Sequence, residues 1–228
     1  MKFWKIIVMS CFMFFSCSSF FWRDAELPKE EINYNGSILE YQVVYKEKDS
    51  LNPLMGTTEK KNYETKIAIY PQGKNKQSIK IENIGSWILP GMIHYNPTND
   101  RLFWVQGIND EYGTNLRKAG VATDVRVNGL KNAKFWTDCS NITTILPSPT
   151  GDAIAMICSE NQLESDNASI NLETAWKIAI WNIADSSPTV HSLNMEWVPE
   201  SNDHTVRWIG TNSVEVRSGS KKSQWKSK

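Results

Sequence analysis

The chain has 228 residues, which suits one domain or two small ones and leaves room for a sizeable core. Hydrophobic residues make up 40% and aromatic residues 11% of it, a composition that excludes a largely disordered protein. Lys and Arg together number 25, as do Asp and Glu, so no basic excess points to a nucleic-acid partner. No apolar run reaches the roughly 18 residues that a membrane-spanning helix needs, which argues against a polytopic membrane protein.

Residues 1–16 have the anatomy of a secretory signal peptide. Lys2 and Lys5 give a positive start, and the apolar stretch 6–15 is too short to span a bilayer. Ser16, a small residue, comes directly before Cys17. The sequence therefore predicts export and cleavage near this point.

The pair Ser16-Cys17 resembles the lipobox of bacterial lipoproteins, in which a small residue precedes the Cys that becomes the acylated first residue. The family usually has Leu three positions before the Cys, where this chain has Phe14. The resemblance covers the signal only. It implies acyl chains such as palmitate on Cys17, a membrane anchor and a place in the cell envelope, at the outer membrane. The alternative is an ordinary secreted protein. We expect residues 17–36 to be the lipidated Cys and a tether.

Two further cysteines, Cys139 and Cys158, lie in the body of the chain. An even pair in an exported protein favours a disulfide, here closing a loop of about 20 residues. The alternative is two buried free thiols. No His lies near either Cys, so we predict no metal site, and nothing in the sequence indicates a cofactor.

Three stretches of the body resemble one another: HYNPTNDRLFWVQG from His94, LPSPTGDAIAMICS from Leu146 and WVPESNDHTVRWIG from Trp197. Each has a Pro, then an Asp three or four residues later, then apolar residues at alternate positions. Pro and Asp favour a tight turn, and the alternation favours a strand with one buried face. The shared acidic residues are Asp100, Asp152 and Asp203.

The repeat has a period near 50 residues, with four short strands expected in each complete copy. The expected strands are 38–45, 65–70 and 77–83 in the first copy; 92–96, 101–106, 121–127 and 133–137 in the second; 143–147, 153–158, 176–182 and 189–194 in the third; and 195–198, 205–209 and 213–217 in the last. This period and strand number predict an all-β, β-propeller-like domain of antiparallel blades over residues 37–218.

The turn SPTGD at 148–152 resembles the corresponding turn of TolB-like propellers, which are related to WD-type propellers. That family generally has six blades, whereas this chain has material for about four. The resemblance therefore implies either a small closed ring or an open arc. The alternative fold is an antiparallel β-sandwich of two packed sheets. Residues 219–228 carry four Lys and no acid, and we expect them to form a basic, solvated tail.

A search for catalytic motifs returns none of the glycine-rich phosphate loops, zinc-protease helices or serine-hydrolase turns. The three His are isolated, and turn chemistry explains the recurring Asp. Trp87, Trp136 and Trp176 lie near expected strand starts, where they could stack on a sugar or a partner side chain; packing in the core is the alternative. We therefore predict a non-enzymatic binding or scaffolding module for an envelope protein or surface polymer. The alternative is a hydrolase or lyase acting on a polysaccharide or peptide.

Overall fold

The computed structural model describes residues 22–49, 58–71, 79–109, 111–113, 116–139, 141–159, 175–195, 197–198 and 201–227. Within these ranges sixteen strands form four antiparallel sheets, which confirms the prediction of an all-β protein. The predicted lipidation site, Cys17, lies outside the described residues. No helix in the described ranges is long and apolar enough to cross a membrane.

The first sheet has the order β1-β3-β4-β5, with β2 pairing along the other half of β3. Its strands are β1 (Arg23–Glu26), β2 (Glu30–Tyr34), β3 (Ser37–Asp49), β4 (Thr58–Tyr70) and β5 (Ile79–Ile84). The prediction of a tether over 17–36 is therefore wrong from residue 23 onward. Asn35 and Gly36 both have positive φ and turn β2 directly into β3, and Ile32 and Tyr34 alternate with polar residues and pack on the core.

The second sheet has the order β6-β7-β8-β9, formed by β6 (Ile88–Asn96), β7 (Arg101–Gly107), β8 (Arg117–Thr123) and β9 (Lys134–Trp136). The strand expected at 121–127 is displaced, because β8 ends at Thr123 and α2 (Val125–Asn128) follows as one helical turn. Asp124 adopts a left-handed φ of 53° between them. The Asp100 carboxylate then accepts a bond of 3.0 Å from the Arg126 backbone N–H, which holds the helical turn.

The third sheet follows the predicted strands closely. It consists of β10 (Asn141–Pro147), β11 (Ala153–Ser159), β12 (Trp176–Asn182) and β13 (Thr189–Ser192), hydrogen-bonded in chain order. Cys139, just before β10, and Cys158 in β11 form a disulfide with a Cα–Cα distance of 5.9 Å. It closes a loop of 19 residues in sequence and lies in the core between the second and third sheets.

The last sheet consists of β14 (His204–Ile209), β15 (Ser213–Ser218) and β16 (Lys221–Lys226), also in chain order. The strand expected at 195–198 is absent from the described residues of that range. The prediction of a solvated tail at 219–228 is wrong, because residues 221–226 pair in continuous register with β15. Trp225 explains this pairing, since it packs against the core between the third and last sheets.

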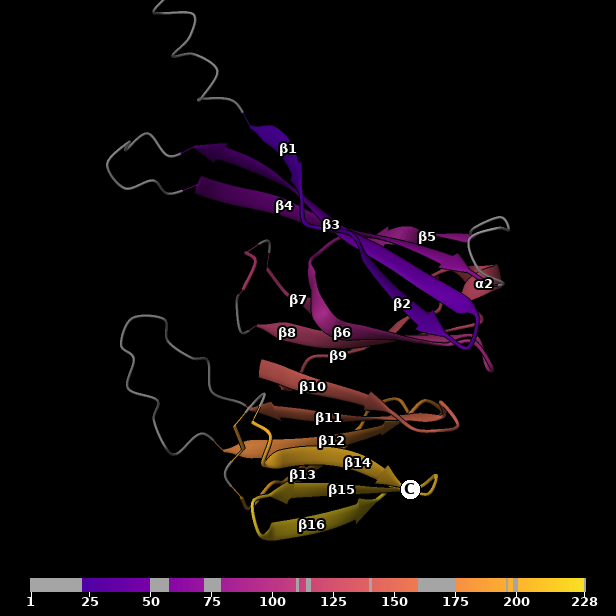
Figure 1. The fold of residues 1–228 in the computed structure, drawn as a ribbon, viewed down its shortest axis with the longest axis vertical. Helices are drawn as coiled ribbons and strands as arrows, with labels where there is room; N and C mark the ends of the chain where they lie inside the picture. The colour runs from indigo at the N-terminus through magenta and orange to yellow at the C-terminus, as the bar shows by residue number, and fades with distance from the viewer. Residues whose placement is uncertain are drawn as a thin grey trace, which may run out of the picture.

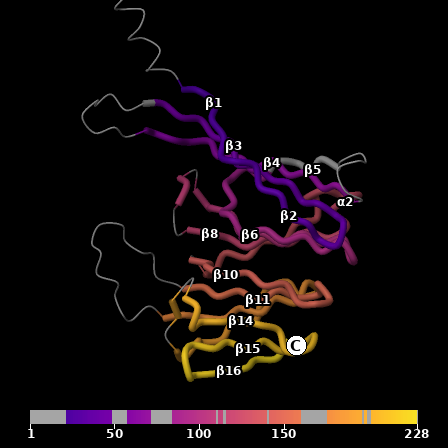
Figure 2. The backbone as a smooth tube through the Cα atoms, viewed as in Figure 1, coloured from indigo at the N-terminus to yellow at the C-terminus, as the bar shows by residue number. Residues whose placement is uncertain are grey.

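The four sheets pack face to face in chain order. The first core joins the first and second sheets through residues such as Leu39, Ile69 and Trp104. A second core joins the second and third sheets, and a third joins the third and last. Figure 1 shows the first sheet at one end of the longest axis and the last sheet at the other, and the tube in Figure 2 follows the same succession.

This stack is open at both ends. No buried core of the described residues joins the first sheet to the last, so these sheets do not close a small ring. A two-layer β-sandwich has one interface between sheets, whereas this molecule has three, so the sandwich alternative is wrong. Each end sheet consequently has one face that no other described sheet covers.

Candidate functional site

The open end of the last sheet carries a basic face whose members are fixed by strand register. Val214 and Val216 point inward to the core, so their neighbours along β15 point outward. Cross-strand pairing then places nine side chains on this face: Thr205, Arg207, Ile209, Ser213, Glu215, Arg217, Lys222, Gln224 and Lys226. We call these nine residues the basic face. It has four cations and one carboxylate, a formal charge of +3.

Glu215 lies at the centre of this face and is only 1% exposed. Its Oε1 accepts from Nε of Arg207 at 2.9 Å and from Nε of Arg217 at 2.8 Å. Its Oε2 pairs with Nζ of Lys222 at 2.6 Å and accepts from Nε2 of Gln224 at 3.0 Å. Basic side chains from all three strands therefore converge on one carboxylate and cover it.

This convergence determines the electrostatics of the face. The Lys222 ammonium first, and then the Gln224, Arg217 and Arg207 donors, lower the pKa of Glu215 to about 2, against the effect of its burial. Its charge offsets only one of the surrounding cations. The side chains of Arg207, Lys222 and Arg217 are still 54%, 47% and 46% exposed, so excess positive charge faces solvent. The arrangement can attract and hold anionic groups.

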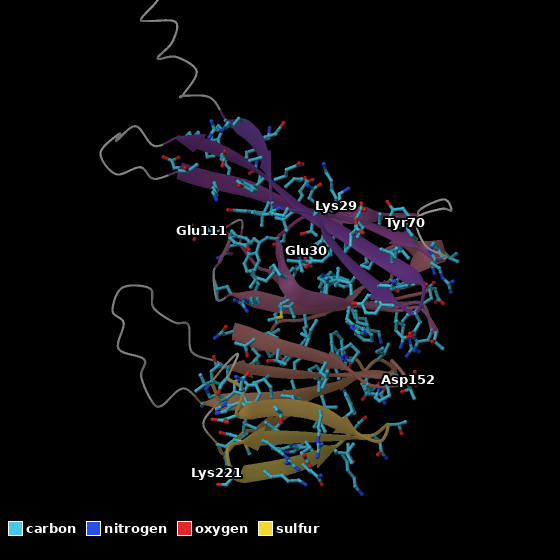
Figure 3. All side chains as sticks on the ribbon, viewed as in Figure 1. Lys29, Glu30, Tyr70, Glu111, Asp152 and Lys221 are labelled. Carbon is cyan, nitrogen blue, oxygen red and sulfur yellow. A yellow bond between two sulfur atoms is a disulfide. The ribbon has the colours of Figure 1, made fainter. Side chains whose placement is uncertain are left out.

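The face lies far from the N-terminal end of the described chain. Figure 3 labels Lys221, the first residue of β16, at the lower end of the molecule, whereas Lys29, between β1 and β2, lies in its upper part. The two ends also differ in charge. The open face of the first sheet has a hollow of about 430 Å³, lined by Asp24, Glu26 and Glu64 with Lys46 and Lys66. That mixed set has more acids than bases.

Two of the three tryptophans predicted as candidates for ligand stacking are buried. Trp87 is fully buried and packs with Tyr45 and Tyr63, and Trp136 is 5% exposed in the core between the second and third sheets. Trp176 is half-buried at the core of the third and last sheets. The structure does not bring them together into one surface; packing accounts for all three.

The recurring aspartates take different partners in the structure. Asp100 is 7% exposed and accepts from the Tyr95 hydroxyl and from Arg126. Asp152 is exposed and pairs with Arg101 of the preceding repeat, whose guanidinium also donates to the Gly151 carbonyl at 2.8 Å. Their shared role is to shape and connect turns.

His204 cannot serve as half of a catalytic pair with Asp203, because both of its nitrogens are engaged elsewhere. Its Nδ1 accepts from the Val198 backbone N–H at 2.8 Å, and its Nε2 is 3.2 Å from the Ser218 hydroxyl. In the described part of the chain, no three His, Cys, Asp or Glu residues are grouped so as to hold a metal ion.

The basic face was not among the sequence-predicted sites. Its signal is present in the sequence, because charged residues alternate with apolar ones in VRW and VEVR, and Lys222, Gln224 and Lys226 take alternate positions in KKSQWK. The prediction of a tail at 219–228 leaves Lys222 and Lys226 unaligned with the arginines, whereas the pairing of β15 with β16 places them on one face. Trp225, an apolar residue between Gln224 and Lys226, is the residue that indicates a third strand.

Comparison with known proteins yields no family: no family model, no curated protein and no solved structure matches the chain.

Proposed function

We propose that the protein is a bacterial envelope lipoprotein, anchored through acylated Cys17, that acts as a non-enzymatic binding module. In this proposal the four sheets are propeller-type blades in an open arc, and the basic face of the last sheet is the binding surface. The observation that carries it is the exposed cationic cluster around Glu215, at the opposite end of the long axis from the first sheet.

Several features support this arrangement. The signal anatomy ends in Ser16-Cys17, as in lipoproteins. An anchor at the first sheet directs the last sheet away from the bilayer, where a component of the envelope can reach it. The disulfide between Cys139 and Cys158 suits an oxidising compartment outside the cytoplasm. The prolines Pro97, Pro149 and Pro199 are 52 and 50 residues apart in the sequence, a spacing typical of propeller blades.

The anchor is tested by the mass of the N-terminal peptide from the membrane fraction of the native host. We expect a peptide that begins at Cys17 with the added mass of acyl chains, and a Cys17→Ser variant that leaves the membrane fraction. An unmodified N-terminus recovered from the soluble fraction would overturn the anchored module.

A further inference from the structure

We infer that the basic face binds an extended anionic polysaccharide. This deepens the proposed function, on which it rests for the compartment in which the polymer would be met. Its physical basis is independent of the anchor. It consists of where the side chains of the last sheet lie, how Glu215 holds them in place, and what charge they carry.

The arginines are held in place while most of their donors stay free. Arg207 contacts Glu215 through Nε and Nη2, and Arg217 contacts it through Nε. A guanidinium has five N–H donors, so each retains several that make no bond to described residues. Because Glu215 restricts their motion, these side chains lose less entropy when they bind an anion. The cluster is thus organised in advance for anionic groups.

The cations are distributed in a way that fits a polymer better than a small anion. They occupy three adjacent strands, about 4.8 Å apart, and three rows along the strands, about 6.8 Å apart. Among the described residues no other sheet packs over this face, so nothing in that part of the chain encloses one ion there. A chain with repeated sulfate, phosphate or carboxylate groups can contact several rows at once, which gives affinity through multivalency.

The composition of the face favours a polysaccharide over other anionic partners. Protein interfaces have cores enriched in aromatic residues and depleted in Lys, whereas this face has two Lys and a single apolar residue, Ile209. Single-stranded nucleic acid is typically bound by aromatic platforms, and the face has no aromatic residue. An anionic bilayer is disfavoured by position, because the face lies at the end remote from the proposed anchor.

The test measures binding of the purified full-length protein to dextran sulfate, with neutral dextran as the control polymer. We expect binding to dextran sulfate that weakens steeply with added salt and no binding to neutral dextran. Lys226→Glu reverses one charge on the face without touching Glu215. It should weaken binding more than about fivefold, since a single cation near an anionic surface contributes about that much. Lys131→Glu, an exposed position outside the face, is the matched control and should bind like the parent.

Two further variants separate binding from folding. The variant R207Q/E215Q/R217Q/K222Q removes the cluster without leaving a buried carboxylate unpaired, and it should lose most of the affinity. Glu215→Gln alone keeps all four cations but removes the carboxylate that holds the arginines in place, so it should bind less tightly than the parent and more tightly than the fourfold variant. A fourfold variant that is folded and binds dextran sulfate like the parent would contradict the assigned face. Circular dichroism of each variant confirms that it is folded.

Three outcomes would overturn the inference: no binding to dextran sulfate at low salt, equal loss in Lys226→Glu and Lys131→Glu, or preference for polyglutamate or phosphatidylglycerol vesicles. These outcomes are distinguishable from failure of the proposed function. A protein that binds dextran sulfate through this face but has an unmodified N-terminus loses the anchor and keeps the site. A lipidated protein with no such binding keeps the anchor and loses the site.

Discussion

Glu215 combines near-complete burial with a formal negative charge, and five donor atoms stabilise it in that state. Burial of a carboxylate costs free energy unless it is paired, so the ionised form is the one compatible with this packing. The same contacts that organise the basic face therefore also stabilise the last sheet.

The first prediction concerns acid sensitivity. The folded-state pKa of Glu215, about 2, is below its ordinary value of 4.5. Its ionised form therefore stabilises the fold above pH 4.5, and this contribution is lost as the pH falls from 4.5 through about 2. In urea unfolding at a series of pH values, Glu215→Gln should show a shallower loss of unfolding free energy across that window. Parallel curves for the two proteins would contradict the assigned contacts.

The second prediction for a single residue concerns Gly107, at the end of β7. A Cβ at Gly107 would overlap the indole ring of Trp87, which is fully buried. Gly107→Ala should lower the unfolding free energy by roughly 1–3 kcal/mol, the usual cost of overpacking a core. Gly85→Ala is the matched control, because a Cβ there meets no atom within 4 Å. Equal unfolding midpoints for the two variants would show that the Trp87 ring can move aside.

The sequence shows which residues are apolar but not which bulky ones are buried. Trp87 is placed in the core by Gly107 on the neighbouring strand, a contact that depends on the pairing of β6 with β7. The disulfide between Cys139 and Cys158 is easier to predict, because the body of the chain has only these two cysteines and so only one pairing. The basic face needed the register of three strands, which a single sequence does not give.

At the scale of elements, β16 is the clearest test of the difference between a tail and a strand. Deletion of residues 219–228 removes the half-buried Trp225 from the third core and leaves β15 without a partner on one edge. We expect the unfolding free energy to fall by about 2–3 kcal/mol, the contribution of one large apolar side chain. Deletion of residue 228 alone is the control. An unchanged urea midpoint after the longer deletion would restore the tail interpretation.

The third sheet was predictable because each of its strands is a compact apolar run bounded by turn residues, as in SPTGD before β11. The end of β8 in the second sheet is harder to predict, because its apolar pattern continues past Asp124 into α2. Only the left-handed backbone at Asp124 separates the strand from the helical turn. In the first sheet, β1 is short and polar, and its pairing with β3 is a long-range property. Local patterns do not contain such pairing.

At the scale of the whole molecule, the open stack predicts unequal local stability. β11 has a sheet packed on each of its faces, whereas β15 has one packed face and one solvent-facing face; both are interior strands of their sheets. Amide hydrogens of β15 should therefore exchange faster than those of β11 in native-state hydrogen exchange, because end units of a stacked array open first. Equal protection of the two strands would indicate a closed or fully cooperative assembly.

The pairing of β1 with β3 limits how far the protein could move from a membrane anchor at Cys17. Because β1 begins at Arg23, about five residues separate Cys17 from the first strand, a length of roughly 17 Å when fully extended. With Cys17 acylated, as proposed, a very short linker would hold the body close to the bilayer. The height of the last sheet above the bilayer would then be set by the stack of sheets and not by the linker. The effective concentration of the protein would therefore be high for a ligand fixed at that height.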